Sequence, residues 1–170
     1  MPTIERTLIG GVGYRWQRDA SLGLVLIDEL ARDAWPPSVE CADLGYGAIY
    51  AAQDLADAQP PYTRLILVAA VEHGDEPGSV RRYRYNGRLP SDEEIHARVR
   101  EAGAGVIDLD HLLVIAQHMN ALPRDVVVFE VEPFEIGASV ELSEPATRLL
   151  ATLRDRVRAE ALGDRVVFGA

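Results

Sequence analysis

The run Arg64–Val71 is the feature that most constrains what this 170-residue chain can fold into. After Arg64 every residue of the run is aliphatic, a pattern typical of a strand that is buried on both faces. Such strands belong to parallel sheets, because the helices that join parallel strands cover both faces of the sheet. Hydrophobic residues make up 48% of the chain, which suffices for a sizeable core. The run therefore predicts the central strand of an α/β fold.

Other expected strands and helices alternate along the sequence. Helical spacing of apolar residues, glycine and proline stops, and the capping pattern of Ser91 with Glu94 mark their boundaries. The order predicts a three-layer α/β sandwich with a mostly parallel central sheet and helices on both faces, in one domain over residues 1–170. Besides the central run, the expected elements are strands at Thr7–Ile9, Val39–Ala42 and Val126–Val131, an edge strand at Ser79–Tyr85, helices at Leu24–Ala34, Ile49–Ala56, Ser91–Val99, Asp108–Met119 and Ser143–Gly163, and at Arg165–Phe168 either a tail or a small extra strand.

The charge balance limits the partners that this chain can have. Seventeen Lys and Arg residues stand against 27 Asp and Glu residues, so the formal net charge is −10 at pH 7. An acidic surface repels phosphate backbones and anionic lipid, which argues against a nucleic-acid or membrane partner. No apolar run is long enough to span a bilayer, and residues 1–6 lack the pattern of a secretory signal. We expect a cytoplasmic protein.

A glycine turn follows the first expected strand. Gly11-Val12-Gly13 precedes a loop that carries Asp19, and Gly23 opens the next helix. Glycine lets the backbone approach a ligand where a side chain would clash. The turn could serve a small-molecule site, but it lacks the third glycine of a dinucleotide-binding fingerprint.

Ligands in parallel α/β folds bind beyond the carboxyl ends of the strands. The loops after Ile9, Ala42 and Val71 and the region around His111 are therefore expected to meet at one crevice.

Several separated segments together resemble the hydrogenase maturation endopeptidases. The N-terminal signature of that family is Gly-x-Gly-Asn-x-x-x-x-Asp-(Asp/Glu)-x-x-Gly. This chain departs from it at Tyr14, in place of Asn, and at Ala20, in place of the second acid. The matches extend over nearly the whole chain, at Gly11, Gly13, Asp19, Gly23, Asp43-Leu44-Gly45, Ala69-Ala70, Pro77–Val80, Asp108–His111, Val131–Pro133, Gly137, Leu142 and Ser143.

The resemblance implies a role in the maturation of [NiFe] hydrogenases. Members of the family bind the nickel-loaded precursor of the large subunit and remove its C-terminal extension. Their site consists of an acid in the loop after the first strand, an Asp at the end of the third strand, and a His on a later helix. By position these become Ala20, Ala70 and His111. The implied partner is the [NiFe]-hydrogenase large-subunit precursor. No cofactor is required, since the nickel would be sensed on that partner.

Two of the three site positions have no group that could bind a metal ion, because methyl groups carry no lone pairs. His111 is the family-matched metal residue, and Asp19 and Glu72 are the acids that could substitute for the two alanines. A metal site of Asp19, Glu72 and His111 would support residual cleavage. We expect instead that these side chains do not converge within metal-bonding reach, and we assign no catalytic residue.

The first loop is the expected place of partner binding. We expect the large rings of Tyr14 and Trp16 to fill the vacated pocket, and the alternative is that they dock a partner peptide. The favoured function is that of a maturation protease relative with reduced or lost peptidase activity. The alternative is a non-catalytic chaperone or adaptor that binds the precursor. The residues expected to bind substrate are Gly11, Gly13, Tyr14, Trp16, Asp43 and Gly45.

Overall fold

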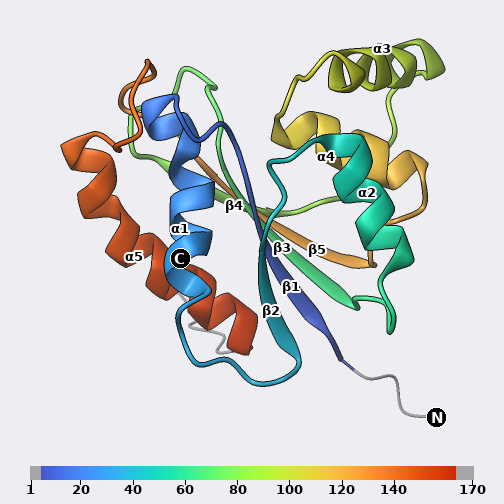
Figure 1. Cartoon of the computed structure of the whole chain (residues 1–170), viewed down its shortest axis with the longest axis horizontal. Helices are drawn as coiled ribbons and strands as arrows, with labels where there is room; N and C mark the ends of the chain where they lie inside the picture. Colours follow the sequence, from blue (N-terminus) through green and yellow to red (C-terminus); the bar gives the residue numbers. More distant parts are fainter. Residues whose placement is uncertain (1–4, 164–170) are drawn as a thin grey trace.

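The computed structural model describes residues 5–163, which form a five-stranded sheet with helices on both faces (Figure 1). The strand order is β2-β1-β3-β5-β4, and β4 alone runs antiparallel to its neighbour. The prediction of a mostly parallel sheet is thus confirmed, and the expected edge strand lies at the border of the sheet as β4. The strands are β1 (Thr7–Val12), β2 (Val39–Asp43), β3 (Arg64–Ala70), β4 (Val80–Arg84) and β5 (Asp125–Val131).

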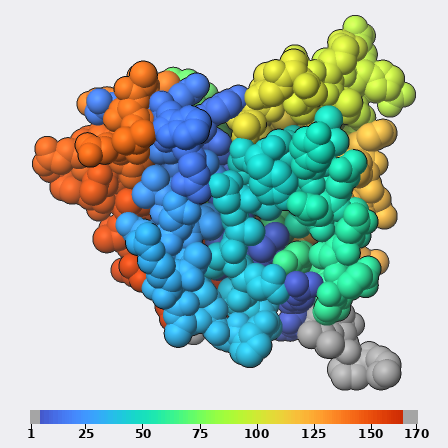
Figure 2. Space-filling model, in the orientation of Figure 1, coloured from blue at the N-terminus to red at the C-terminus, as the bar shows by residue number. Residues whose placement is uncertain are grey.

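The helices form the two outer layers. Helices α1 and α5 cover one face of the sheet, whereas α2 and α4 cover the other (Figure 1). Helix α3 packs on α4 and α2 and projects at a corner of the molecule (Figure 2). This arrangement confirms the predicted three-layer sandwich. The helices are the short 3-10 helix η1 (Arg18–Ser21), α1 (Leu22–Leu30), α2 (Ala48–Asp57), α3 (Asp92–Gly103), α4 (Leu109–His118) and α5 (Glu144–Leu162).

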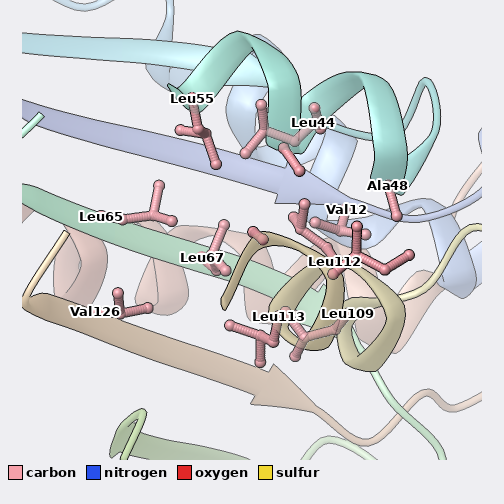
Figure 3. Close-up of a cluster of buried hydrophobic side chains, with 14 of the residues drawn as sticks. Val12, Leu44, Ala48, Leu55, Leu65, Leu67, Leu109, Leu112, Leu113 and Val126 are labelled. Carbon is pink, nitrogen blue, oxygen red and sulfur yellow. The ribbon is translucent and has the colours of Figure 1, made fainter. Parts of the chain in front are cut away.

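The central strand β3 separates two hydrophobic clusters. Side chains alternate between the faces of a strand, so odd-numbered residues of β3 contact one helical layer and even-numbered residues the other. Figure 3 shows the cluster in which side chains from β1, β3, β5, α2 and α4 converge. Leu65, Leu67 and Ala69 belong to that cluster, and Ile66, Val68 and Ala70 belong to the cluster under α1 and α5.

Local signals in the sequence set most helix boundaries. Ser91 and Glu94 form the expected capping box at the start of α3, and the Asp108 side chain accepts a hydrogen bond from the His111 backbone N–H at 2.8 Å. Helix α5 begins after Ser143 and ends at Gly163, whose φ of 72° is left-handed.

Helix α1 differs from its predicted extent at both ends. It begins at Leu22 rather than after Gly23, because the preceding residues form η1. It ends at Leu30, well before Pro36-Pro37. The indole N–H of Trp35 donates to the Leu30 carbonyl at 2.7 Å and so satisfies a backbone acceptor that the helix leaves free at its end.

The segment Arg165–Phe168, expected to be either a tail or a small strand, lies outside the described residues. Between residues 5 and 163, none of the helices combines the length and the apolar character that crossing a membrane requires.

Candidate functional site

A pocket of about 660 Å³ lies beyond the carboxyl ends of β1 and β2. Its walls come from five segments: the loop after β1, helix α1, the end of β2 with the loop after it, the turn before α4 and the segment after β5. In Figure 2 the blue segment after β1 and the yellow segment before α4 adjoin at the top of the molecule. The lining residues are Gly13, Tyr14, Arg15, Trp16, Gln17, Leu24, Asp43, Gly45, Tyr46, Ile107, Gly137 and Ala138.

Five of the six residues expected to bind substrate line this pocket, namely Gly13, Tyr14, Trp16, Asp43 and Gly45. Gly11 does not line it. A Cβ at position 11 would lie 2.4 Å from the Gly23 carbonyl oxygen, so this glycine lets α1 approach β1 closely. The loop after Val71, which we expected at the same crevice, does not contribute to the lining either.

Tyr14 connects two walls of the pocket. Its hydroxyl accepts a hydrogen bond from the Ile107 backbone N–H at 2.7 Å, which joins the loop after β1 to the turn before α4. Arg15 joins the loop after β1 to the end of β2 and to α1. Its guanidinium contacts Asp28 of α1 at 2.7 Å and Asp43 at 2.8 Å. The ring of Trp16, by contrast, is 72% exposed. Of the two aromatic residues in the loop, Tyr14 therefore builds the pocket and Trp16 remains accessible at its rim.

The segment 135–139 runs beside the loop after β1. The Arg18 N–H donates to the Ser139 carbonyl at 3.0 Å, and the Ser139 N–H donates to the Trp16 carbonyl at 3.2 Å. This parallel pairing brings Gly137 and Ala138 into the pocket wall. Sequence reasoning missed their role here. The available signal was Gly137, which occurs among the family-like segments.

Asp19 is fully buried and is not available to a metal ion. Its Oδ2 accepts hydrogen bonds from Phe134 N at 3.1 Å, Glu135 N at 2.8 Å and Ser143 Oγ at 2.8 Å. Its Oδ1 accepts a hydrogen bond from Ser143 N at 2.8 Å. Both carboxylate oxygens are thus occupied by the chain. Asp19 holds the segment after β5 and the start of α5 against the first loop, and its assignment as a substitute metal ligand was wrong.

His111 is also occupied on both sides of its ring. Nδ1 lies 2.5 Å from Asp108 Oδ1, and Nε2 lies 2.5 Å from Glu101 Oε2. Burial by itself would lower the pKa of His111, but the hydrogen bonds and charges of Asp108 and Glu101 outweigh it and raise that pKa above its usual 6.5. With a carboxylate of the chain at each nitrogen, neither side of the ring is open to a metal ion.

The stability of the protein should fall as the pH rises through the pKa of His111. Because the folded-state pKa is raised, the stabilisation by imidazolium is fully present below about pH 6.5 and is lost above the folded-state value. We therefore expect the His111→Gln variant to show a flatter dependence of the urea midpoint on pH above about pH 6.5. The exposed His96 of α3 provides the control, since His96→Gln should keep the wild-type slope. A wild-type slope in His111→Gln would contradict this assignment.

The third proposed substitute, Glu72, lies beyond the end of β3 and is exposed. The structure does not bring Asp19, Glu72 and His111 together. Among residues 5–163 there is no group of three His, Cys, Asp or Glu side chains that could hold a metal ion.

The strand position that faces the His111 helix is Ala69 rather than Ala70. Ala69 packs in the cluster under α2 and α4, whereas Ala70 packs on the opposite face against α1 and α5. Transfer by position to Ala70 was therefore wrong by one residue, which in a strand reverses the face. The chemical result is unchanged, because both positions carry only a methyl group.

Glu130 is a buried carboxylate that sequence reasoning did not single out. It is the register partner of Ala69 across β3 and β5 and faces the same side of the sheet. Its Oε1 accepts a hydrogen bond from Tyr83 at 2.7 Å, and its Oε2 lies 2.5 Å from His73 Nε2. Burial and the bond to Glu130 raise the pKa of Tyr83, which therefore stays a donor. The signal that could have found Glu130 is a charge within the apolar run Val126–Val131.

Comparison with known proteins gives consistent results. A family model described as hydrogenase maturation protease matches residues 25–160. None of the curated protein sequences matches the chain significantly. Among solved structures, the hydrogenase 2 maturation peptidase from a Thaumarchaeota archaeon is similar at 31% identity, with a TM-score of 0.66. The match covers 94% of this chain and 99% of that one.

More distant structures share the fold. The hydrogenase maturating endopeptidase HybD from E. coli has a TM-score of 0.70 at 18% identity, over 94% of each chain. The [NiFe] hydrogenase maturation protease HybD from Thermococcus kodakarensis has a TM-score of 0.62 at 18% identity, over 92% of this chain and 99% of that one. On the match of the family model and the 31% identity over nearly the whole length, the chain belongs to the hydrogenase maturation protease family.

Proposed function

We propose that this chain binds a [NiFe]-hydrogenase large-subunit precursor and has reduced or no peptidase activity toward it. Membership of the family supports the choice of partner. The observation that supports a loss of activity is that none of the family's three metal-site positions can bind a metal ion in this chain. Ala20 and Ala69 have no donor atom, and both ring nitrogens of His111 face carboxylates of the chain itself.

Peptide hydrolysis requires a group that activates water and a group that stabilises the charge on the carbonyl oxygen. A metal ion would supply both, but it needs several converging ligands. The acids that could have replaced the missing ligands are engaged elsewhere or exposed, as Asp19 and Glu72 show. Binding without cleavage is the function that this arrangement supports best.

The pocket beyond β1 and β2 is the proposed place of binding. Its walls combine aromatic side chains with three glycines, Gly13, Gly45 and Gly137. Backbone groups can hydrogen-bond an extended peptide, while rings supply apolar contact area at little entropic cost. The exposed rings of Trp16 and Tyr46 extend this surface outward.

The test is incubation of the purified chain with a nickel-loaded precursor that carries its C-terminal extension. We expect the two proteins to co-elute on size exclusion and the precursor mass to remain unchanged by mass spectrometry. Complete removal of the extension would contradict the loss of activity. Absence of any complex would contradict the proposed partner.

Trp16 should carry a large share of the binding energy. Truncation of a tryptophan that becomes buried in an interface can cost about 2 kcal/mol or more, so we expect Trp16→Ala to weaken precursor binding by roughly 30-fold. Because the ring is 72% exposed, the thermal midpoint should change little. Biolayer interferometry with the precursor would measure the affinity.

Tyr50 offers a matched control for that experiment. Its ring is 65% exposed on α2 but does not line the pocket. Tyr50→Ala should therefore bind the precursor like the wild type. Equal losses in the two variants would place the binding surface elsewhere than the pocket.

A further inference from the structure

The pocket has few groups that could coordinate a metal ion. Among its lining residues the sole carboxylate is Asp43, and neither an imidazole nor a thiol lines it. Both oxygens of Asp43 are engaged, because Oδ1 accepts a hydrogen bond from Gly45 N at 2.7 Å and Oδ2 contacts Arg15 at 2.8 Å. First-row transition metals in proteins are held mainly by imidazole, thiolate and carboxylate ligands. The lining thus offers a partner aromatic, backbone and cationic groups, but it offers a metal ion no free ligand.

His111 takes part in the pocket only indirectly. Its buried ring joins Glu101, in the last turn of α3, to Asp108, the N-cap of α4. The chain between these two acids carries Ile107, which lines the pocket and is held on its other side by Tyr14. His111 therefore fixes the turn that forms one wall of the pocket.

His111, which the resemblance matches to the family's metal-binding histidine, therefore has a structural role in this chain. We propose that recognition of the partner by this chain does not depend on a metal ion, and that His111 links α3 to α4 instead of reading the partner's nickel. The inference rests on the proposed binding of a hydrogenase precursor. It predicts that the chain binds the same surface of the precursor whether or not the precursor contains nickel.

The first test uses the chain alone. Isothermal titration with Ni²⁺ and with Zn²⁺ should show no saturable site with a dissociation constant below about 100 μM, in the wild type and in His111→Gln alike. The exposed His96 controls for adventitious binding by a histidine, through His96→Gln. A one-to-one site that is present in the wild type and His96→Gln, and is lost in His111→Gln, would overturn the inference.

The second test compares metal-free and nickel-loaded precursor. We expect their affinities for the wild-type chain to agree within about threefold, which is less than 1 kcal/mol. His111→Gln should weaken both forms by the same factor, because it loosens the pocket wall. Circular dichroism would confirm that this variant is folded.

The outcomes separate the two proposals. A preference of tenfold or more for the nickel-loaded precursor, abolished in His111→Gln, would overturn metal-independent recognition and leave the precursor as partner. Failure to bind either form would overturn the proposed function. The titration of the chain alone would still decide whether His111 belongs to a metal site.

Discussion

Replacing Asp19 by alanine is expected to lower the free energy of unfolding by about 3 kcal/mol or more. The side chain is fully buried and accepts four hydrogen bonds. Alanine would leave three backbone N–H groups and the Ser143 hydroxyl without this acceptor. A buried donor that loses its partner costs about 1–3 kcal/mol, and hydrogen bonds to a charged group are among the stronger ones.

The damage should extend beyond the site of substitution. Ser143 is the N-cap of α5, and its hydroxyl lies between Asp19 and the Ala146 N–H. The segment 135–139, which supplies a pocket wall, is attached to the same carboxylate through Glu135. A loss of about 3 kcal/mol corresponds to a decrease of roughly 6–12 °C in the thermal midpoint for a chain of this length.

Urea unfolding, monitored by circular dichroism, measures the loss of stability in Asp19→Ala. Asp110→Ala provides the control. Asp110 pairs with Arg98 through a carboxylate whose side chain is 60% exposed. Exposed pairs contribute at most about 1 kcal/mol, so this variant should remain close to the wild type. Similar unfolding midpoints for the two variants would show that the Asp19 network is not an anchor of the fold.

Gly23→Ala should be comparably disruptive, through crowding and not through lost hydrogen bonds. A Cβ at this position would lie 2.3 Å from the Val68 carbonyl oxygen and 3.0 Å from the Val12 carbonyl oxygen. Both obstacles are backbone atoms of the sheet, so α1 would have to move away from β1 and β3. We expect a loss of about 3 kcal/mol or more, at the upper end of overpacking effects, or a chain that fails to fold.

Gly103→Ala is the matched control, since it makes the same substitution at the end of α3. A Cβ there would meet no heavy atom within 4 Å, and the residue is helical. Alanine is the better helix former, so this variant should equal or slightly exceed the wild type in stability. If Gly23→Ala unfolds at the same urea concentration as Gly103→Ala, the close approach of α1 to the sheet is not required.

Most of the fold could be predicted because its signals are local. The aliphatic run after Arg64 identified a strand covered on both faces, and the alternation of strands and helices identified a parallel sheet. Ser91 with Glu94 and Gly163 marked helix ends by hydrogen-bonding patterns that span only a few residues. The end of α1 was missed because the indole of Trp35 supplies its cap from outside the helix.

The site was harder to predict because its contacts join residues far apart in sequence. Asp19 bonds to residues more than a hundred positions away, and no local pattern distinguishes such a carboxylate from a metal ligand. The contact between His111 Nε2 and Glu101 is likewise a tertiary contact, because it joins α4 to α3. The glycine turn correctly located the pocket. It follows the carboxyl end of β1, and ligands in parallel sheets bind beyond the carboxyl ends of the strands.

The register between β3 and β5 also bears on which side chains position 69 can accept. An acid introduced at position 69 would stand beside the carboxylate of Glu130 on the same face, with strands about 4.8 Å apart. Two carboxylates so close in a buried place resist ionising together, so the change would destabilise the chain before it restored any ligand. Glu130 therefore disfavours an acid at position 69, and a carboxylate ligand there would be better tolerated once the charge of Glu130 were removed.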